Sequence, residues 1–82
     1  MNLVIHYNVE RGYEDSALAF ARRLFAVFDE EIDSLALVPV EDEDFDVYLD
    51  GGLVHSQSQS GRAPRVADVK ALLDKVTALS SQ

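Results

Sequence analysis

The order of the apolar runs is the feature that most restricts what this chain can fold into. A short β-type run at Leu3–Tyr7 is followed by a helical pattern over Tyr13–Phe28, and a second β-type run follows at Leu35–Val40. Because a strand–helix–strand segment forms a parallel pair with a right-handed crossover, these runs predict the core of an α/β sheet. The apolar stripe expected to bury the helix consists of Ala17, Phe20, Ala21, Leu24, Phe25 and Phe28.

The next segment has the pattern of a β-hairpin. Apolar and polar side chains alternate over Phe45–Asp50, Asp50-Gly51-Gly52 is a strong turn signal, and Leu53–Ser56 is the returning strand. Pro39 lies near the end of the preceding strand. We expect it either to end the regular pairing there or to occupy a position that needs no N–H donor.

The chain ends in a second helical pattern. A polar segment over Gln57–Arg65 predicts a loop, and Val66–Leu79 predicts a helix with a buried apolar stripe. Residues 1–79 are therefore expected to form a single domain of order β-α-β-β-β-α, with a frayed end at 80–82. The stripe of the second helix consists of Val66, Val69, Leu72, Leu73, Val76 and Leu79.

This order predicts a mixed four-stranded sheet with two helices. Four strands make a sheet roughly 15–20 Å wide, and two helices of about 10 Å diameter cover one such face. We therefore expect a two-layer sandwich with both helices on one face. The other face either docks a protein partner or a second copy of the chain, or simply exposes scattered apolar groups. Its candidate residues are Val4, His6, Ala36, Val38, Tyr48 and Leu53, or the opposite set on the first two strands.

Charge and composition exclude several classes of function. The 82 residues carry a net charge of −8, and Lys70 and Lys75 are the only lysines. Such a surface repels phosphate backbones and anionic lipid, which argues against nucleic-acid and membrane partners. The charge suits a solvated surface, as in a salt-loving organism, or an acidic docking face. With no long apolar run and no signal-peptide pattern, the expected location is the cytoplasm.

The segment after the first strand carries a resemblance to a known family. Tyr7-Asn8-Val9-Glu10-Arg11-Gly12-Tyr13 resembles the Rdx family of selenoprotein W-like, thioredoxin-like proteins, in which this place reads Tyr-Cys-x-x-Cys-Gly-aromatic. The match continues through the second strand at Leu35–Pro39 and the hairpin at Phe45–Val54. Ser56 and the segment Gly61–Pro64 resemble the family's loop before its last helix. The resemblance implies a thioredoxin-like fold over almost the whole chain.

The departure from the family pattern bears directly on chemistry. Asn8 and Arg11 stand where the resemblance places the two redox residues, and the chain has no cysteine. Neither side chain forms a disulfide or acts as a thiolate nucleophile, so we expect no thiol–disulfide activity. A cis-proline before the third strand, a second thioredoxin feature, is not evident, since Asp44 precedes Phe45.

The remaining residues suggest few alternatives. His6 and His55 are the only histidines, and each is expected to be a partly exposed strand residue, with His55 on the face opposite Val54 and near Asp46 or Tyr48. The acidic run at residues 41–44 lacks the glycine of a calcium loop, so we expect no metal site, and no cofactor.

The loop that stands where the resemblance places the redox residues, called here the relic redox loop, is the strongest candidate for a binding site. Its backbone N–H groups and Arg11 could grip a carboxylate or phosphate, or Arg11 could simply pair with Glu10, Glu14 or Asp15. The first interpretation is a non-catalytic interaction module without assigned catalytic residues. One alternative is a small enzyme or anion-binding protein built on this loop, and the enzyme site would join His6, Asn8, Arg11 and Tyr13. Another is a redox protein that borrows a partner's thiol. The loop consists of Asn8, Val9, Glu10, Arg11, Gly12 and Tyr13.

Overall fold

The computed structural model describes the backbone of residues 1–42 and 44–80, with side chains up to Lys75. The described elements follow the predicted order, with two short helical turns added. They are β1 (Asn2–Asn8), α1 (Glu14–Phe28), the 3-10 turn η1 (Asp29–Glu31), β2 (Ser34–Val40), β3 (Phe45–Leu49), β4 (Gly52–Ser56), α2 (Gln57–Ser60) and α3 (Val66–Ser80). Ser80, expected in the frayed end, is the last residue of α3. Outside this description lie residue 43 of the acidic run, the stripe side chains at 76 and 79, and residues 81–82 of the expected frayed end.

The strands form one mixed sheet in the order β2-β1-β3-β4. β1 pairs with β2 in parallel over all seven residues, while β1–β3 and β3–β4 are antiparallel. This confirms the parallel pair joined by the α1 crossover and the closing hairpin. Pro39 stays in register opposite Tyr7, so the second of its two expected placements holds.

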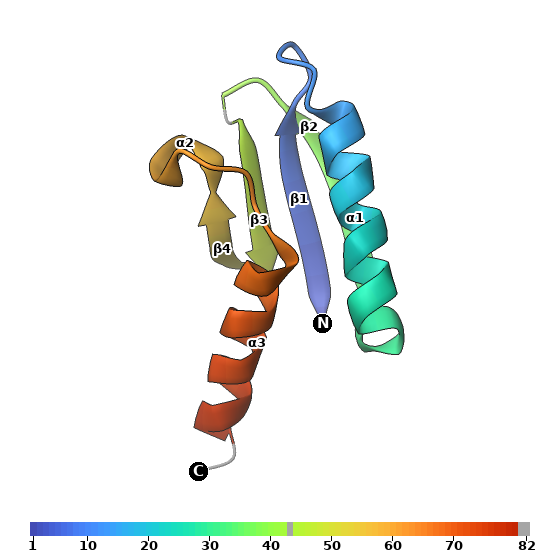
Figure 1. Cartoon of the computed structure of the whole chain (residues 1–82), viewed down its shortest axis with the longest axis vertical. Helices are drawn as coiled ribbons and strands as arrows, with labels where there is room; N and C mark the ends of the chain where they lie inside the picture. The colour runs from blue at the N-terminus through green and yellow to red at the C-terminus, as the bar shows by residue number, and fades with distance from the viewer. Residues whose placement is uncertain (43, 81–82) are drawn as a thin grey trace.

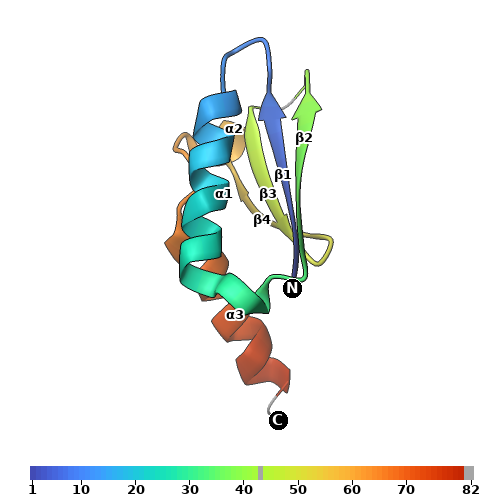
Figure 2. The same cartoon turned by 90° about the vertical axis from the view of Figure 1, so that its right-hand side faces the viewer.

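Both long helices cover the same face of the sheet, as predicted (Figures 1 and 2). α1 lies along β1, and α3 packs beside β4 and continues past the end of the sheet (Figure 1). The core forms between these two layers, where apolar burial supplies most of the stabilisation. Its members are Leu3, Ile5, Ala17, Phe20, Ala21, Leu24, Phe28, Phe45, Val47, Leu49 and Val69.

The predicted buried stripe of α1 is wrong at Phe25. Its side chain is 48% exposed, whereas Leu24 and Phe28 are buried. At 100° per residue, Phe25 lies on the flank of the helix rather than at the centre of its buried stripe. It therefore leans past the sheet instead of onto it.

The hairpin turn matches its prediction, but the strand that follows does not keep a simple register. Asp50 and Gly51 both have positive φ, at 49° and 86°, as a two-residue turn of this hand requires. The pairing shifts between Val47 and Tyr48, so Val54 is an extra residue in β4. His55 therefore lies opposite Val47, on the helix-covered face, where it is buried and not partly exposed as expected.

The segment predicted as one polar loop over 57–65 contains the single helical turn α2. Gly61 ends it with a left-handed φ of 78°, and its N–H donates to the Gln57 carbonyl. The sequence carries no apolar periodicity there because a single turn buries no stripe of its own. Among the helices of the described residues, none combines the length and apolar character that crossing a membrane requires.

Candidate functional site

The relic redox loop begins inside the sheet. Asn8, expected in the turn, is the last residue of β1 and is only 5% exposed. Its side-chain amide donates to the Glu41 carbonyl at 3.3 Å, and its side-chain oxygen accepts from the Arg11 N–H at 3.0 Å. Asn8, at the position where the resemblance places the first redox residue, therefore links two parts of the loop to each other and links the loop to the end of β2.

The backbone of the same loop is also internally bonded. Gly12 N–H donates to the Val9 carbonyl at 3.1 Å, and Tyr13 N–H donates to the Asn8 carbonyl at 3.2 Å. Gly12 has a φ of 77°, which a side chain would strain. Because the N–H groups of residues 11–13 already have acceptors, the loop itself offers these donors to no anion.

Arg11 does not pair with any of the acids next to it in sequence. Its guanidinium lies 3.2 Å from the Asp44 carboxylate, across the loop before β3. Asp44 precedes β3, and the pairing of β1 with β3 brings it beside the relic loop. The Asn8 N–H also donates to the Asp44 carbonyl there. The Arg11 side chain stays largely exposed, so this ion pair contributes little to stability.

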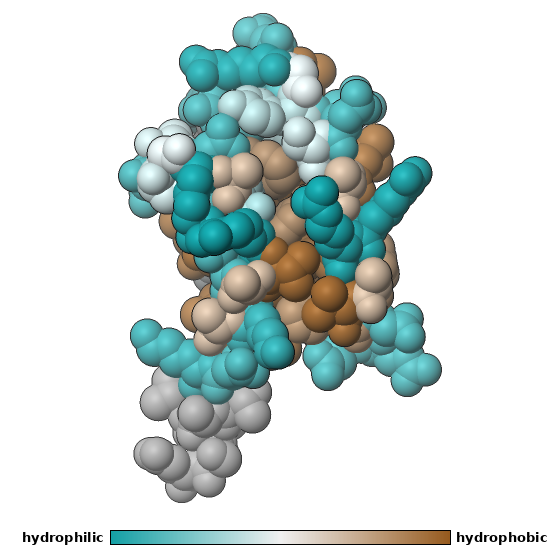
Figure 3. Space-filling view, viewed as in Figure 1, coloured by the Kyte–Doolittle hydropathy of each residue, from teal (hydrophilic) through white to brown (hydrophobic). Residues whose placement is uncertain are grey.

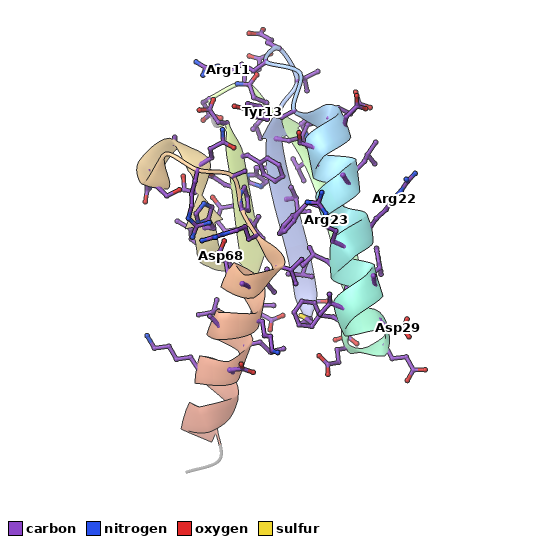
Figure 4. The ribbon with its side chains drawn as sticks, in the orientation of Figure 1. Arg11, Tyr13, Arg22, Arg23, Asp29 and Asp68 are labelled. Carbon is purple, nitrogen blue, oxygen red and sulfur yellow. The ribbon has the colours of Figure 1, made fainter. Side chains whose placement is uncertain are left out.

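Tyr13 connects the loop to the opposite side of the molecule. Its hydroxyl accepts a hydrogen bond from the Gln57 side-chain amide at 2.7 Å, and its ring meets Phe45 edge-on at 6.1 Å. Figure 4 shows Tyr13 below Arg11 at the head of α1. The residue holds α2 and the loop against the end of the core.

The structure does not bring His6 to this loop. His6 lies on the helix-free face of β1, where its ring is 4.9 Å from the ring of Tyr48, while Tyr13 packs on the helix-covered face. Three surface grooves lie on or beside the helix layer, with volumes of about 320, 430 and 250 Å³, and none is lined by His6, Arg11 or Tyr13. None of these three grooves therefore joins the three side chains into an enzyme site.

The grooves follow the helices. The groove of about 250 Å³ lies between α1 and α3, with Val27, Phe28 and Leu73 among its lining residues. Figure 3 shows hydrophobic side chains in this cleft, with charged groups around it. Within the described part of the chain, no three histidine, aspartate or glutamate side chains gather in a way that could hold a metal ion.

A second polar cluster, centred on His55, was not found by sequence reasoning. His55 is 8% exposed, and its Nε2 lies 2.9 Å from both the Ser60 hydroxyl and the Arg62 carbonyl. Its Nδ1 is 3.7 Å from the Asp68 carboxylate. The bulge at Val54 turns His55 to this side, and the sequence carries no signal for that bulge beyond the hairpin itself.

The hydrogen bonds of this cluster decide what it can do chemically. The role of His55 depends on which ring nitrogen carries the proton. A proton on Nε2 is donated to the Arg62 carbonyl, which can only accept, and in that tautomer Nε2 cannot take a proton from Ser60. The Ser60 hydroxyl donates to the Ser56 carbonyl at 2.8 Å. In that tautomer, with the Ser60 proton donated to the Ser56 carbonyl, the serine, histidine and aspartate form a structural network in which no base is bonded to the serine hydroxyl proton.

Asp68 is the centre of charge in the cluster. It accepts both ends of the Arg62 guanidinium, at 2.8 and 2.9 Å, and the N–H of Arg65 at 2.8 Å. The hydrogen bonds to Arg62 lower the pKa of Asp68 to about 2, from an ordinary value of 3.8. The cluster therefore fastens the loop after α2 to the first turn of α3.

We expect Asp68→Asn to lower the free energy of unfolding by about 1 kcal/mol at pH 7, because solvent screening reduces the value of a partly exposed pair. Since the folded pKa is depressed, this contribution is present above pH 3.8 and is lost as the pH falls toward 2. Urea denaturation of both proteins at pH 7 and pH 2 measures it. The difference between them should shrink at pH 2, and a constant difference would contradict the assignment.

Comparisons with known proteins bear on the fold and the family. The model of the Rdx family matches residues 2–75. A selenoprotein W-related protein from Vibrio cholerae has a solved structure that is 21% identical, with a TM-score of 0.80, over 92% of this chain and 94% of that one. A Bordetella parapertussis protein is 20% identical with a TM-score of 0.79, over 90% and 94% of the two chains. Among proteins with curated descriptions, none matches the chain.

Proposed function

The chain belongs to the Rdx family, and from that membership we propose that it is a non-catalytic member that acts as a protein-interaction module. The domain has the family's thioredoxin-like fold, which the likeness to the solved structures supports. It contains no cysteine, and the family's two redox positions hold Asn8 and Arg11. A domain of this kind has no thiol of its own with which to exchange disulfides.

The state of the relic loop supports a structural role for it. Asn8 is buried and uses both ends of its amide within the protein, and Arg11 is paired with Asp44. A reactive position needs an accessible and chemically poised side chain, and Asn8 has neither property. The loop therefore serves the fold, and the interaction falls to another surface.

The observation that carries the proposal is the helix-free face of the sheet. Leu3 and Ile5 are buried beneath the helices, so the alternate residues of β1 face the other way, where no helix lies (Figure 2). This face exposes or half-exposes apolar side chains from all four strands, and such a contiguous patch is typical of a docking surface. Its members include Val4, Ala36, Val38, Tyr48 and Leu53.

The proposal predicts that a charge placed on this face removes the partner. Leu53 is 44% exposed on β4, so Leu53→Asp should leave the fold intact and burden the docking surface with an unpaired carboxylate. We expect recovery of the partner from native lysate on the immobilised domain to fall at least about tenfold, as the loss of about 1.4 kcal/mol of binding would produce. Quantitative mass spectrometry of the captured proteins measures it.

Ala67→Asp is the matched control, because Ala67 is exposed in the first turn of α3, where an added acid is tolerated. It should recover the partner at the wild-type level. Equal recovery by Leu53→Asp and by the control would show that the helix-free face does not bind. An insulin-reduction assay complements the capture. Insulin disulfides should be reduced no faster with the domain present than in buffer alone.

A further inference from the structure

We propose that the free edge of β2 is an interface for a second copy of this chain, paired antiparallel about a two-fold axis at Ala36. The inference rests on the proposed interaction role and adds to it the edge of the sheet, which meets the helix-free face at Ala36. The edge consists of the outward backbone groups of residues 34–40, together with the flank of α1 that lies beside them.

The backbone groups that point out of this edge follow from the ladder. Asn8 N–H donates to the Asp44 carbonyl and Asp50 N–H donates to the Asn2 carbonyl, so the even residues of β1 bond to β3. The odd residues of β1 therefore bond to β2. In a parallel ladder, the residues of β2 in register with them direct their own N–H and carbonyl groups away from β1, toward the free edge. Those partners are Leu35, Leu37 and Pro39.

The position of Pro39 agrees with this assignment. Its missing N–H would have pointed outward, where the β1–β2 ladder needs no donor. The free edge thus presents the N–H groups of Leu35 and Leu37 and the carbonyls of all three residues. β2 is the last strand of the sheet, and no other strand of the described residues pairs with it.

This edge is complementary to itself. In an antiparallel pair centred on Ala36, Leu35 of one copy faces Leu37 of the other, and each exchanges its N–H and carbonyl with the facing residue. Two such pairs give four hydrogen bonds and leave Pro39 outside the bonded region. A two-fold axis requires this isologous arrangement, in which the same patch serves both copies.

The adjoining flank of α1 provides apolar area for the same interface. Arg22 extends from α1 on the side away from α3, while Arg23 points toward it (Figure 4). Leu18 and Phe25 stand four residues before and three after Arg22, so they share its flank. They are 43% and 48% exposed. This accounts for an aromatic ring that the core of a single copy does not cover.

The two edges of the sheet differ in how they are protected. β4 carries the bulge at Val54, and α2 and α3 pack against it, which discourages pairing with another strand. β2 pairs without irregularity over seven residues and contains no charged side chain. Natural edge strands are usually protected by a charge, a proline or a distortion. β2 has only Pro39, near its end, which leaves the outward N–H groups of Leu35 and Leu37 able to pair.

The charge of the chain sets the conditions for this association. Each copy carries −8, and acidic segments at 29–33 and 41–44 flank β2 at its two ends. Mutual repulsion opposes the dimer at low ionic strength and is screened as salt is added. Dimerisation should therefore strengthen with salt, in contrast to an interface held by ion pairs.

Sedimentation velocity of the full chain from about 5 to 500 µM, in 20 mM and 1 M NaCl, tests the proposal. We expect a monomer–dimer equilibrium whose dissociation constant is at least about tenfold lower in 1 M NaCl. In the same samples, amide hydrogen exchange at Leu35 and Leu37 should slow as the concentration rises, while that of Val38, which bonds to β1, should not change. A monomer under all conditions, or a dimer without this protection, would overturn the proposal.

Two variants test whether the copies associate through this edge, and Leu37→Pro separates the edge from the helix-free face because Leu37 lies on the helix-covered side. Ala36→Lys places two like charges together at the axis, on an exposed side chain. It should weaken the dimer at least about tenfold, although it makes the net charge of each copy less negative. Ala67→Lys makes the same change of charge on α3 and should leave the dimer intact. Leu37→Pro removes an outward N–H and spares the β1–β2 ladder, so it should also dissociate the dimer.

The outcomes distinguish this inference from the proposed function. Leu53→Asp lies on β4 and should abolish capture of the partner while preserving the dimer. Leu37→Pro should abolish the dimer while preserving capture through the helix-free face. Loss of the dimer in both variants would contradict the placement of the interface on β2.

Discussion

Replacing Phe45 by alanine is expected to lower the free energy of unfolding by about 3–4 kcal/mol, as for other large-to-small changes of a buried aromatic side chain. Phe45 is 2% exposed at the start of β3. Its ring meets Phe20 of α1 at 5.9 Å and Tyr13 of the relic loop at 6.1 Å, both edge-on. One side chain therefore joins the sheet, the first helix and the loop, and its removal opens a cavity between all three.

The expected loss is large for a domain of this size. An 82-residue domain has a stability of about 4–12 kcal/mol, so Phe45→Ala leaves a protein close to its unfolding midpoint if the wild type lies at the lower end. Urea denaturation followed by circular dichroism measures the change. Phe45→Leu is the matched control, since it retains most of the volume and should cost about 1.5 kcal/mol or less. Equal losses in both variants would show that the ring contacts do not matter.

The order of elements and most of the core were predictable because they depend on local periodicity. Phe20 and Leu24 recur at helical spacing, so their burial follows from the backbone geometry. On the first strand the alternation predicted two opposite sets but not which of them is covered, and the structure buries Leu3 and Ile5. The family pattern could be placed for the same reason. The relic loop is the segment between the first strand and the first helix, so its position follows from these two elements alone.

Positions at the margin of the core were not predictable in this way. Phe25 is apolar and nearly in phase with the buried stripe, and only the width of the sheet decides whether it is covered. His55 reached the helix-covered face because one extra residue, Val54, reverses the side on which the end of β4 points. Both outcomes depend on the placement of elements that are distant in the sequence.

The partners within the candidate sites depend on the same long-range placement. Arg11 pairs with Asp44 and not with its sequence neighbours, and Asn8 bonds to the Glu41 carbonyl, because β1 brings its end beside the ends of β2 and β3. Sequence reasoning identified the loop and its residue types. It could not identify contacts more than 30 residues apart, which the register of the sheet creates.

Asn8→Ala is expected to lower the free energy of unfolding by about 2 kcal/mol, because two hydrogen bonds are lost from a buried position. The Glu41 carbonyl and the Arg11 N–H lose their side-chain partner, at 3.3 and 3.0 Å in the structure. Water can reach both groups in part, since Glu41 and Arg11 are exposed, and this limits the loss. Glu10→Ala, an exposed change in the same loop, should stay within about 0.5 kcal/mol of the wild type.

Asn8→Asp separates the two hydrogen bonds of this side chain. The carboxylate still accepts from the Arg11 N–H, but it cannot donate to the Glu41 carbonyl and instead places charge against it. Burial and the facing carbonyl disfavour the charged carboxylate, whereas the protonated carboxyl can donate to the Glu41 carbonyl as the amide does. Relative to the wild type, the variant should therefore be least stable at pH 7 and recover stability as the pH falls toward 4. Urea denaturation of both proteins across this range measures the recovery, and an Asn8→Ala variant as stable as Glu10→Ala would refute the view that Asn8 holds the loop in place.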